Sequence, residues 1–379
     1  MTNIQMHGEN PISLDFQKGV FKHFMIKEIH EQPKTVRLEL DGRIKKGIVD
    51  LYDLGMDDIL ARVEKIYMIG CGTAYHAGLV GKDIIEKLVR VNVESDIASE
   101  FGYRDILWGE NQLMIVISQS GETADTLVAL REAKRHGIPI LAITNVVGST
   151  VAQEADKVIY TLAGPEISIA STKAYTSQLV VVYLLALYMA QLRMSHDEKA
   201  LRTIGNELSH IGDYLEEVFE QEEKIIKLAW QHHQMQSVFY LGRGLDCAVA
   251  MEGALKLKET SYIHAEAYAT GELKHGPIAL ITDQSPVITL LTQNHMVERS
   301  MYNIQEVKTR GGKVIAVCKA DLQEQCRDCD DIITIPNVNS IITPILSVVP
   351  LQMFAYYMAT LRGNNVDQPR NLTKSVQIE

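Results

Sequence analysis

The sequence is poor in cysteine, has no excess of positive charge and contains no uninterrupted apolar run as long as a membrane span. Its five cysteines are an odd number with no secretory signal ahead of them, which favours free thiols in a reducing compartment, so we expect a cytoplasmic protein. The longest uncharged apolar stretch, 179–190, falls well short of the roughly 20 residues of a membrane span and is predicted to be a buried helix. The net charge of -11 argues against nucleic acid or an anionic membrane as a partner.

The rest of the composition is typical of a folded protein. The chain is 46% hydrophobic and 22% charged, and its length of 379 residues is enough for two domains that each bury a core. The negative charge does not exclude a small phosphorylated ligand, because the N–H groups at the start of a helix can hold a phosphate whatever the global charge.

The same unit occurs twice along the chain. The apolar run 66–72 ends in two spaced glycines and is followed by helical spacing, and 238–244 repeats this pattern 172 residues later. The segment 113–145 recurs from Pro286 onward at an offset of 174. An offset held to within two residues indicates a duplicated α/β domain. Each copy alternates strand and helix patterns, which predicts a parallel sheet whose ligands bind beyond the carboxyl ends of its strands.

We predict five segments on this basis. They are an N-terminal linker and helix (1–45), a first α/β domain (46–190), one or two exposed linking helices (191–225), a second α/β domain (226–363) and a C-terminal tail or lid (364–379).

The sharpest local pattern is SQSGETADT, residues 118–126, between an apolar strand and a helix. Three hydroxyls (Ser118, Ser120 and Thr123), a glycine and the free amides of a helix start form a phosphate cradle without a lysine. The alternative is ordinary helix capping, but a cap needs only one hydroxyl. We therefore favour a phosphate site.

The turn GCGTAYHAG, residues 70–78, has two explanations. Glu94 lies 22 residues beyond Gly72, near where a dinucleotide fold places its ribose-binding acid, but Tyr75 stands where the third glycine of that fingerprint belongs. We therefore interpret Gly72 and Thr73 as the floor and a donor for a different small ligand, and predict no cofactor.

Charged residues elsewhere leave the chemistry open. Glu252, Lys256 and Glu259 share one helix face, which fits a catalytic set and a solvated ion-pair face about equally well. The segment GELKHGP places His275 in a probable loop, where a histidine is free to titrate.

A metal site is not predicted. The HAE at 264–266 and the CxxC at 326–329 together resemble a zinc deaminase pattern, but no proline precedes the first cysteine and about 60 residues separate the two elements. A lone CxxC also lacks two of the ligands of a structural zinc site.

Six blocks of the sequence, in order along the chain, resemble the isomerase half of the glucosamine-6-phosphate synthase (glutamine–fructose-6-phosphate aminotransferase) family. The resemblance implies two sugar isomerase (SIS) domains, each a three-layer α/β/α sandwich, in a homodimer that converts fructose 6-phosphate toward glucosamine 6-phosphate. The blocks are 23–33, 71–78, 118–126, 170–179, 252–277 and 367–376.

The resemblance also implies roles for individual residues. The phosphate would be held by Ser118, Gln119, Ser120 and Thr123, and the sugar contacted by Thr73 and Ser171. Lys374 would form a Schiff base at C2, Glu259 would move a proton between C1 and C2, and Lys256 would assist the hydroxyls. His275 would reach in from the neighbouring subunit and open the sugar ring.

Three alternatives accompany this hypothesis. Full-length members of the family begin with a glutaminase domain that opens on a cysteine, whereas this chain has none before Cys71, so we expect no glutamine hydrolysis and either an excised domain or a natural stand-alone isomerase. An amino-sugar-phosphate deaminase shares the duplicated fold. A non-catalytic phosphosugar-binding module would need the cradle but not Lys256, Glu259, His275 and Lys374.

Overall fold

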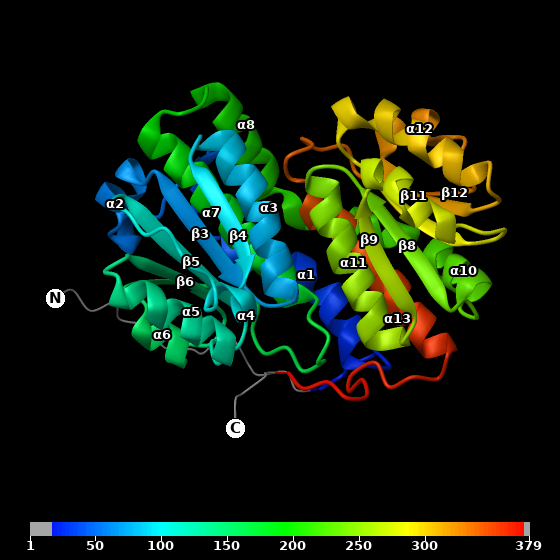
Figure 1. The fold of residues 1–379 in the computed structure, drawn as a ribbon, viewed down its shortest axis with the longest axis horizontal. Coiled ribbons are helices and arrows are strands. Elements are labelled where there is room, and N and C mark those ends of the chain that lie inside the picture. The colour runs from blue at the N-terminus through cyan, green and yellow to red at the C-terminus, as the bar shows by residue number, and fades with distance from the viewer. Residues whose placement is uncertain (1–16, 375–379) are drawn as a thin grey trace.

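Two five-stranded parallel sheets lie side by side in the computed structural model, which describes residues 17–374 (Figure 1). The strands of the first sheet run in the order β4–β3–β5–β6–β7, and those of the second in the order β12–β11–β10–β8–β9. In each sheet the first strand along the chain lies inside, with the second on one side and the third on the other. The strands are β3 (Lys65–Gly70), β4 (Asn92–Ile97), β5 (Gln112–Ser118), β6 (Ile140–Thr144), β7 (Lys157–Tyr160), β8 (Ser237–Gly242), β9 (His264–Ala269), β10 (Pro286–Leu291), β11 (Lys313–Lys319) and β12 (Asp331–Ile335).

Helices cover both faces of each sheet, because the central strands are apolar on both sides. In β3, Tyr67 and Ile69 belong to the core beneath α4 and α5, whereas Ile66 and Met68 face the opposite way, toward α3 and α7. The predicted fold class, two α/β/α sandwiches, is confirmed. The helices of the first sheet are α3 (Thr73–Leu88), α4 (Ala98–Phe101), α5 (Ala124–Arg135), α6 (Thr150–Glu154) and α7 (Lys173–Arg193), and those of the second are α10 (Glu222–His232), α11 (Leu245–Ser261), α12 (Val297–Lys308) and α13 (Thr343–Leu361).

The two sandwiches share one continuous core. Their inner faces, covered by α3 and α7 on one side and α11 and α13 on the other, bury into a single apolar cluster, and α1 (Phe24–Leu40) packs against α7 and α13. The helices α7 and α13 are long and apolar enough to cross a membrane, but 89% and 83% of their apolar windows are buried inside the protein. This burial confirms the prediction of a buried helix over 179–190.

Three short helices connect the two sandwiches: α8 (Glu198–Ser209), α9 (Ile211–Val218) and the start of α10. They are not simply exposed, as the charged sequence of 191–225 led us to expect. Each buries an apolar face, and α9 packs against α1 and α13, because its apolar residues recur at helical spacing among the charges. A small hairpin, β1 (Ile44–Lys45) and β2 (Ile48–Val49), and the helix α2 (Asp57–Arg62) precede the first sheet.

The C-terminal tail leaves α13 and returns to the first sandwich. Figure 1 shows it, in red, passing below α1. The backbone N–H of Ile169 donates to Asp367, and the hydroxyl of Ser168 donates to the carbonyl of Val366. The described part of the tail ends at Lys374, and the rest of the predicted lid, 375–379, lies outside the described residues, as do residues 1–16 of the predicted linker.

Candidate functional site

The candidate site lies at the carboxyl edge of the first sheet, where the chain order reverses. The inner strand β3 has β4 on one side and β5 on the other, so the turns after β3 and β5 are adjacent. Ligands of open parallel sheets bind at this switch point. Gly72 and Thr73 follow β3, and Ser118 ends β5.

The loop after β5 folds back on its own hydroxyl groups. Ser118 Oγ accepts the N–H of Gly121 at 3.0 Å and lies 3.0 Å from Thr123 Oγ1, and Ser120 Oγ accepts the N–H of Glu122 at 3.2 Å. Thr123 is the N-cap of α5 but makes no side-chain hydrogen bond to that helix. Plain helix capping therefore does not explain these hydroxyls, and the first-turn amides of α5 face the same loop.

Gly121 is required by the geometry of this loop. Its φ is +67°, and a Cβ there would lie 2.1 Å from Ser149 Oγ. The neighbouring Glu122 side chain accepts the N–H and the hydroxyl of Thr150, at 2.8 and 2.7 Å, which fixes the loop to the start of α6. The predicted cradle is thus a tight, preorganised turn.

The helix-face residues of the second copy meet the first copy at Thr73. Lys256 Nζ donates to Thr73 Oγ1 at 3.1 Å, and Thr73 Oγ1 donates to Glu252 Oε1 at 3.1 Å. Glu252 Oε2 lies 2.7 Å from Nδ1 of the buried His76, and Lys256 Nζ lies 2.5 Å from Glu259 Oε2. Glu252 and Lys256 are fully buried. The interpretation as a solvated ion-pair face is therefore wrong, because α11 packs against α3 and places these residues between the two domains.

Burial and charge set the protonation of this network. Burial opposes the charged form of Lys256, but the carboxylates of Glu252 and Glu259 outweigh it and raise the pKa of Lys256. Burial also raises the pKa of Glu259, although Lys256 works against the shift. The side chain of Glu259 keeps 21% of its surface exposed, so it is the acid of this set that a substrate can reach. A carboxylate with a raised pKa suits proton transfer.

The tail lysine is held by a carboxylate that the sequence did not reveal. Lys374 Nζ donates to Glu166 Oε2 at 2.7 Å and to the carbonyl of Ser168. The same oxygen of Glu166 accepts the hydroxyl of Ser171 at 3.0 Å, and its other oxygen accepts the N–H groups of Thr172 and Ala174. Burial works against ionised Glu166, but Lys374 and the N–H groups of Thr172 and Ala174 together outweigh it and lower the pKa of this carboxyl. Glu166 stands in a segment with no helical or strand period, so no sequence signal marked it.

A chain of hydrogen bonds links the loop of Glu166 to the cradle. Asn145, just after β6, donates its N–H to the carbonyl of Gln119 at 3.1 Å and its Nδ2 to the carbonyl of Gly164 at 2.8 Å. The structure therefore brings the predicted residues together in two sets, one around Thr73 and one around Lys374, at one edge of the sheet.

His275 is the exception. It is exposed at the end of a 3-10 turn (Thr270–His275) of the second domain, and within residues 17–374 no hydrogen bond or ion pair joins it to Lys256, Glu259 or Lys374. Its predicted contribution from a neighbouring subunit stays a prediction.

The equivalent edge of the second sheet is filled from within. Asp246, in the first turn of α11, is buried and accepts the N–H and the hydroxyl of Thr292, the residue that follows β10. Ala74 stands at the equivalent position of the first copy, since Gly70 and Gly242 pack against Ala74 and Asp246 in the same way. The loop after β10 also carries His295 and Val297 where the first copy has Gly121 and Thr123. The two sheet edges therefore differ, and only the first keeps the loop that the sequence predicts to hold a phosphate.

Comparison with known proteins identifies this architecture. The SIS domain pattern matches residues 59–188 and 233–362, which contain the two sheets. The chain belongs to the SIS domain family. This double SIS chain is 52% identical over 369 residues to the glutamine–fructose-6-phosphate aminotransferase (isomerizing) of Clostridium tetani, and 47% identical over 365 residues to that of Thermus thermophilus.

A solved structure supports the same placement. The SIS chain superposes on the C-terminal domain of glucosamine-fructose-6-phosphate aminotransferase from Francisella tularensis with a TM-score of 0.89 and 36% identity, across 93% of this chain and 100% of that one. The predicted resemblance to the isomerase half of this enzyme is confirmed. The match to these two relatives covers 96% of this chain but only 60% of the length of each relative. A glucosamine-6-phosphate deaminase from Thermotoga maritima, at 24% identity and a TM-score of 0.76, shares the fold.

Proposed function

We propose that this double SIS chain is the isomerase part of a glucosamine-6-phosphate synthase. It binds fructose 6-phosphate at the carboxyl edge of the first sheet and converts it toward glucosamine 6-phosphate with ammonia, as a cytoplasmic homodimer. The observation that carries this proposal is the contact of Lys374 with Glu166, because it brings an amine from the tail to the sheet edge that has the phosphate cradle. The similarity to two fructose-6-phosphate aminotransferases supports fructose 6-phosphate as the substrate.

The residues supply the chemistry as follows. The cradle of Ser118, Gln119, Ser120 and Thr123 holds the phosphate, with Gly72 as the floor. Lys374, held at the sheet edge by Glu166, attacks the C2 carbonyl as the neutral amine, and water leaves as the imine forms. The iminium acidifies the C1–H bond, so that a carboxylate is a sufficient base.

Proton transfer and release complete the cycle. Ammonia displaces Lys374 from C2, and Glu259 takes a proton from C1 and returns it to C2, which moves the carbonyl to C1. Lys256, held charged between two carboxylates, stabilises the negative charge that develops on the sugar oxygens. Ser171 and Thr73 orient the hydroxyls, and His275 of the second subunit opens the ring.

Borohydride trapping tests this proposal directly. Reduction in the presence of fructose 6-phosphate is expected to leave the sugar attached to Lys374, as found by mass spectrometry of the tail peptide. Lys374→Arg, which keeps the charge but cannot form an imine, is the matched control. An unmodified tail in the wild-type chain would remove the Schiff-base step.

The deaminase alternative shares the fold and is distinguished by assay. Isomerisation of fructose 6-phosphate and ammonia release from glucosamine 6-phosphate are measured side by side, and predominant release would reverse the assignment. A non-catalytic sensor would bind the sugar phosphate but show neither reaction.

A further inference from the structure

The helix α1 lies outside both matched SIS segments, yet it carries buried polar groups that reach the site. Its residues precede 59, where the first match begins. The N–H of Met25 donates to Asp367 of the tail at 2.9 Å, and Gln32 contacts Thr176 in the first turn of α7. The helix thus contacts the tail that carries Lys374 and the start of α7, which follows the loop of Glu166.

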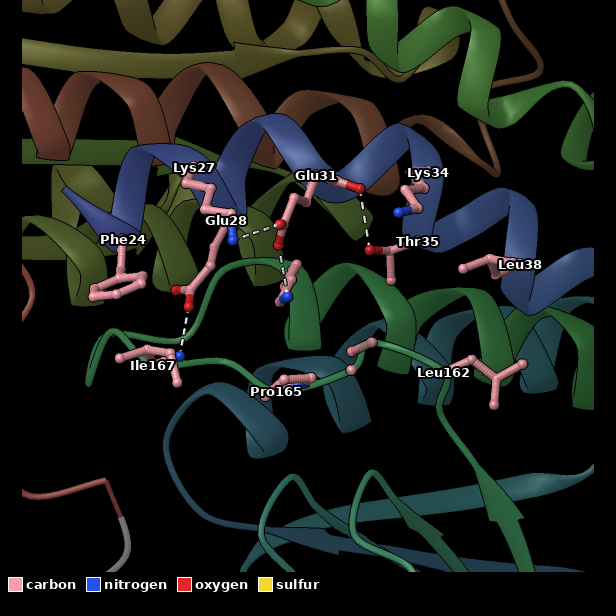
Figure 2. Close-up of a pocket in the computed structure, with 13 residues that line it drawn as sticks. Phe24, Lys27, Glu28, Glu31, Lys34, Thr35, Leu38, Leu162, Pro165 and Ile167 are labelled. Carbon is pink, nitrogen blue, oxygen red and sulfur yellow. Dashed lines mark hydrogen bonds and ion pairs between the residues drawn. The ribbon is translucent and has the colours of Figure 1, made fainter. Parts of the chain in front are cut away.

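Glu28 is the member of this set nearest to the chemistry. It is 2% exposed, and its carboxyl accepts the backbone N–H groups of Ile167 and Ser168. Figure 2 shows its side chain leaving α1 and pointing at Ile167 across the edge of a pocket. These two residues directly follow Glu166, and the carbonyl of Ser168 is the second acceptor for Lys374.

The backbone that Glu28 holds is irregular, and other hydrogen bonds to it come from the tail and from Asn145. No strand or helix covers the chain between the end of β7 at Tyr160 and the start of α7 at Lys173. A buried N–H left without an acceptor is destabilising, so the loop adopts the conformation in which both amides reach the Glu28 carboxyl. That conformation also sets where Glu166 and the Ser168 carbonyl point.

We propose that Glu28 is a positioning residue for the Schiff-base lysine: it fixes the backbone at 167–168 and thereby the two acceptors that hold the amine of Lys374. The inference rests on the proposed function. It assigns to α1 a part in the reaction, and it makes the catalytic unit larger than the two SIS domains.

The experiment compares Glu28 with Glu39 on the same helix. Glu39 is fully buried and accepts the N–H of Leu162 at 2.7 Å, in the same loop but at the end away from Lys374. We expect Glu28→Ala to lower kcat for fructose 6-phosphate isomerisation, and the rate of borohydride trapping at Lys374, by at least about tenfold, since small displacements of catalytic groups cost up to about 10²-fold. The KM should change less than about threefold, because the phosphate cradle is on another loop.

Two further variants separate positioning from folding. Glu28→Gln keeps an acceptor of the same shape and should restore most of kcat, whereas Glu39→Ala should lower the melting temperature but leave kcat within about twofold. The inference is overturned if folded Glu28→Ala keeps the wild-type kcat, or if Glu39→Ala loses kcat equally. Absence of trapping in the wild-type chain would instead overturn the proposed function, so the two failures are distinguishable.

Discussion

Thr73 of the first domain and Lys256 of the second are joined by a hydrogen bond of 3.1 Å, and the lysine side chain is fully buried. The bond crosses from α3 to α11, and Glu252 closes it into a triangle. In the proposed function each SIS copy is incomplete alone, because the first supplies the predicted phosphate loop and the second supplies the charged groups of α11.

The triangle predicts a stability effect at Glu252. Glu252→Gln leaves Lys256 and His76 buried with one carboxylate fewer, and breaking a buried pair costs about 3–5 kcal/mol. We expect the free energy of unfolding in urea to fall by about 3 kcal/mol, less if Glu259 compensates. The exposed Lys258→Gln on the same helix should change it by less than about 0.5 kcal/mol. An equal loss in both variants would argue against the network.

A second prediction concerns the phosphate loop. Gly121→Ala forces a methyl group into contact with Ser149 and should weaken binding of inorganic phosphate and fructose 6-phosphate by more than about tenfold, which is about 1.4 kcal/mol. Gly137→Ala is the matched control, because its φ is +70° but nothing lies within 4 Å of the added Cβ. Calorimetry of both variants is decisive: similar losses would mean that backbone strain alone, and not the cradle, was measured.

The third prediction is a pH dependence. Burial, with the neighbouring Glu166, raises the pKa of Glu28 from 4.5 to about 8. The folded state therefore favours the protonated carboxyl, and its stabilising contribution is complete below pH 4.5 and is lost as the pH rises toward 8. Glu28→Gln removes this titration, so its unfolding free energy should decline less than that of the wild type between pH 5 and 8, by on the order of a few kcal/mol. The exposed Glu324→Gln should follow the wild-type slope.

A fourth prediction tests the filled edge of the second sheet. Asp246→Ala leaves the buried N–H of Thr292 without its acceptor, at a cost of about 1–3 kcal/mol, whereas the Thr292 hydroxyl keeps Thr343 Oγ1 at 2.8 Å. Formate has the size of the carboxylate that the substitution removes, so the melting temperature of this variant should rise with formate concentration more than that of Asp246→Asn, which keeps an acceptor. Equal responses in the two variants would show that the carboxylate does not occupy an anion position.

The last prediction concerns the proposed dimer. If His275 serves the neighbouring subunit, mixing inactive His275→Ala with inactive Glu259→Gln should recover part of the isomerase activity, since some mixed dimers contain one intact site. Homogeneous dimers of either variant are the controls. No recovery after subunit exchange would assign His275 to its own chain or to no site at all.

Much of this protein follows from local pattern. The apolar strand of 66–72 and the hydroxyl-rich loop of 118–126 predict a parallel sheet with a phosphate site at its edge. Such patterns can be recognised in the sequence because strand burial, a glycine turn and a helix start depend on residues close in sequence. The repeat at offsets of 172 and 174 likewise indicates two copies without a structure.

The tertiary structure alone decided which charges act together. The spacing of Glu252, Lys256 and Glu259 fitted a surface and a site equally, and only the packing of α11 on α3 buried them beside Thr73. No sequence pattern marked Glu166 or Glu28 as a site residue. Their proposed roles depend on the tail, which brings Lys374 into contact with Glu166 from 208 positions away in the sequence. Local propensity determines helices and strands, whereas the protonation of a buried group depends on neighbours that only the folded chain brings near.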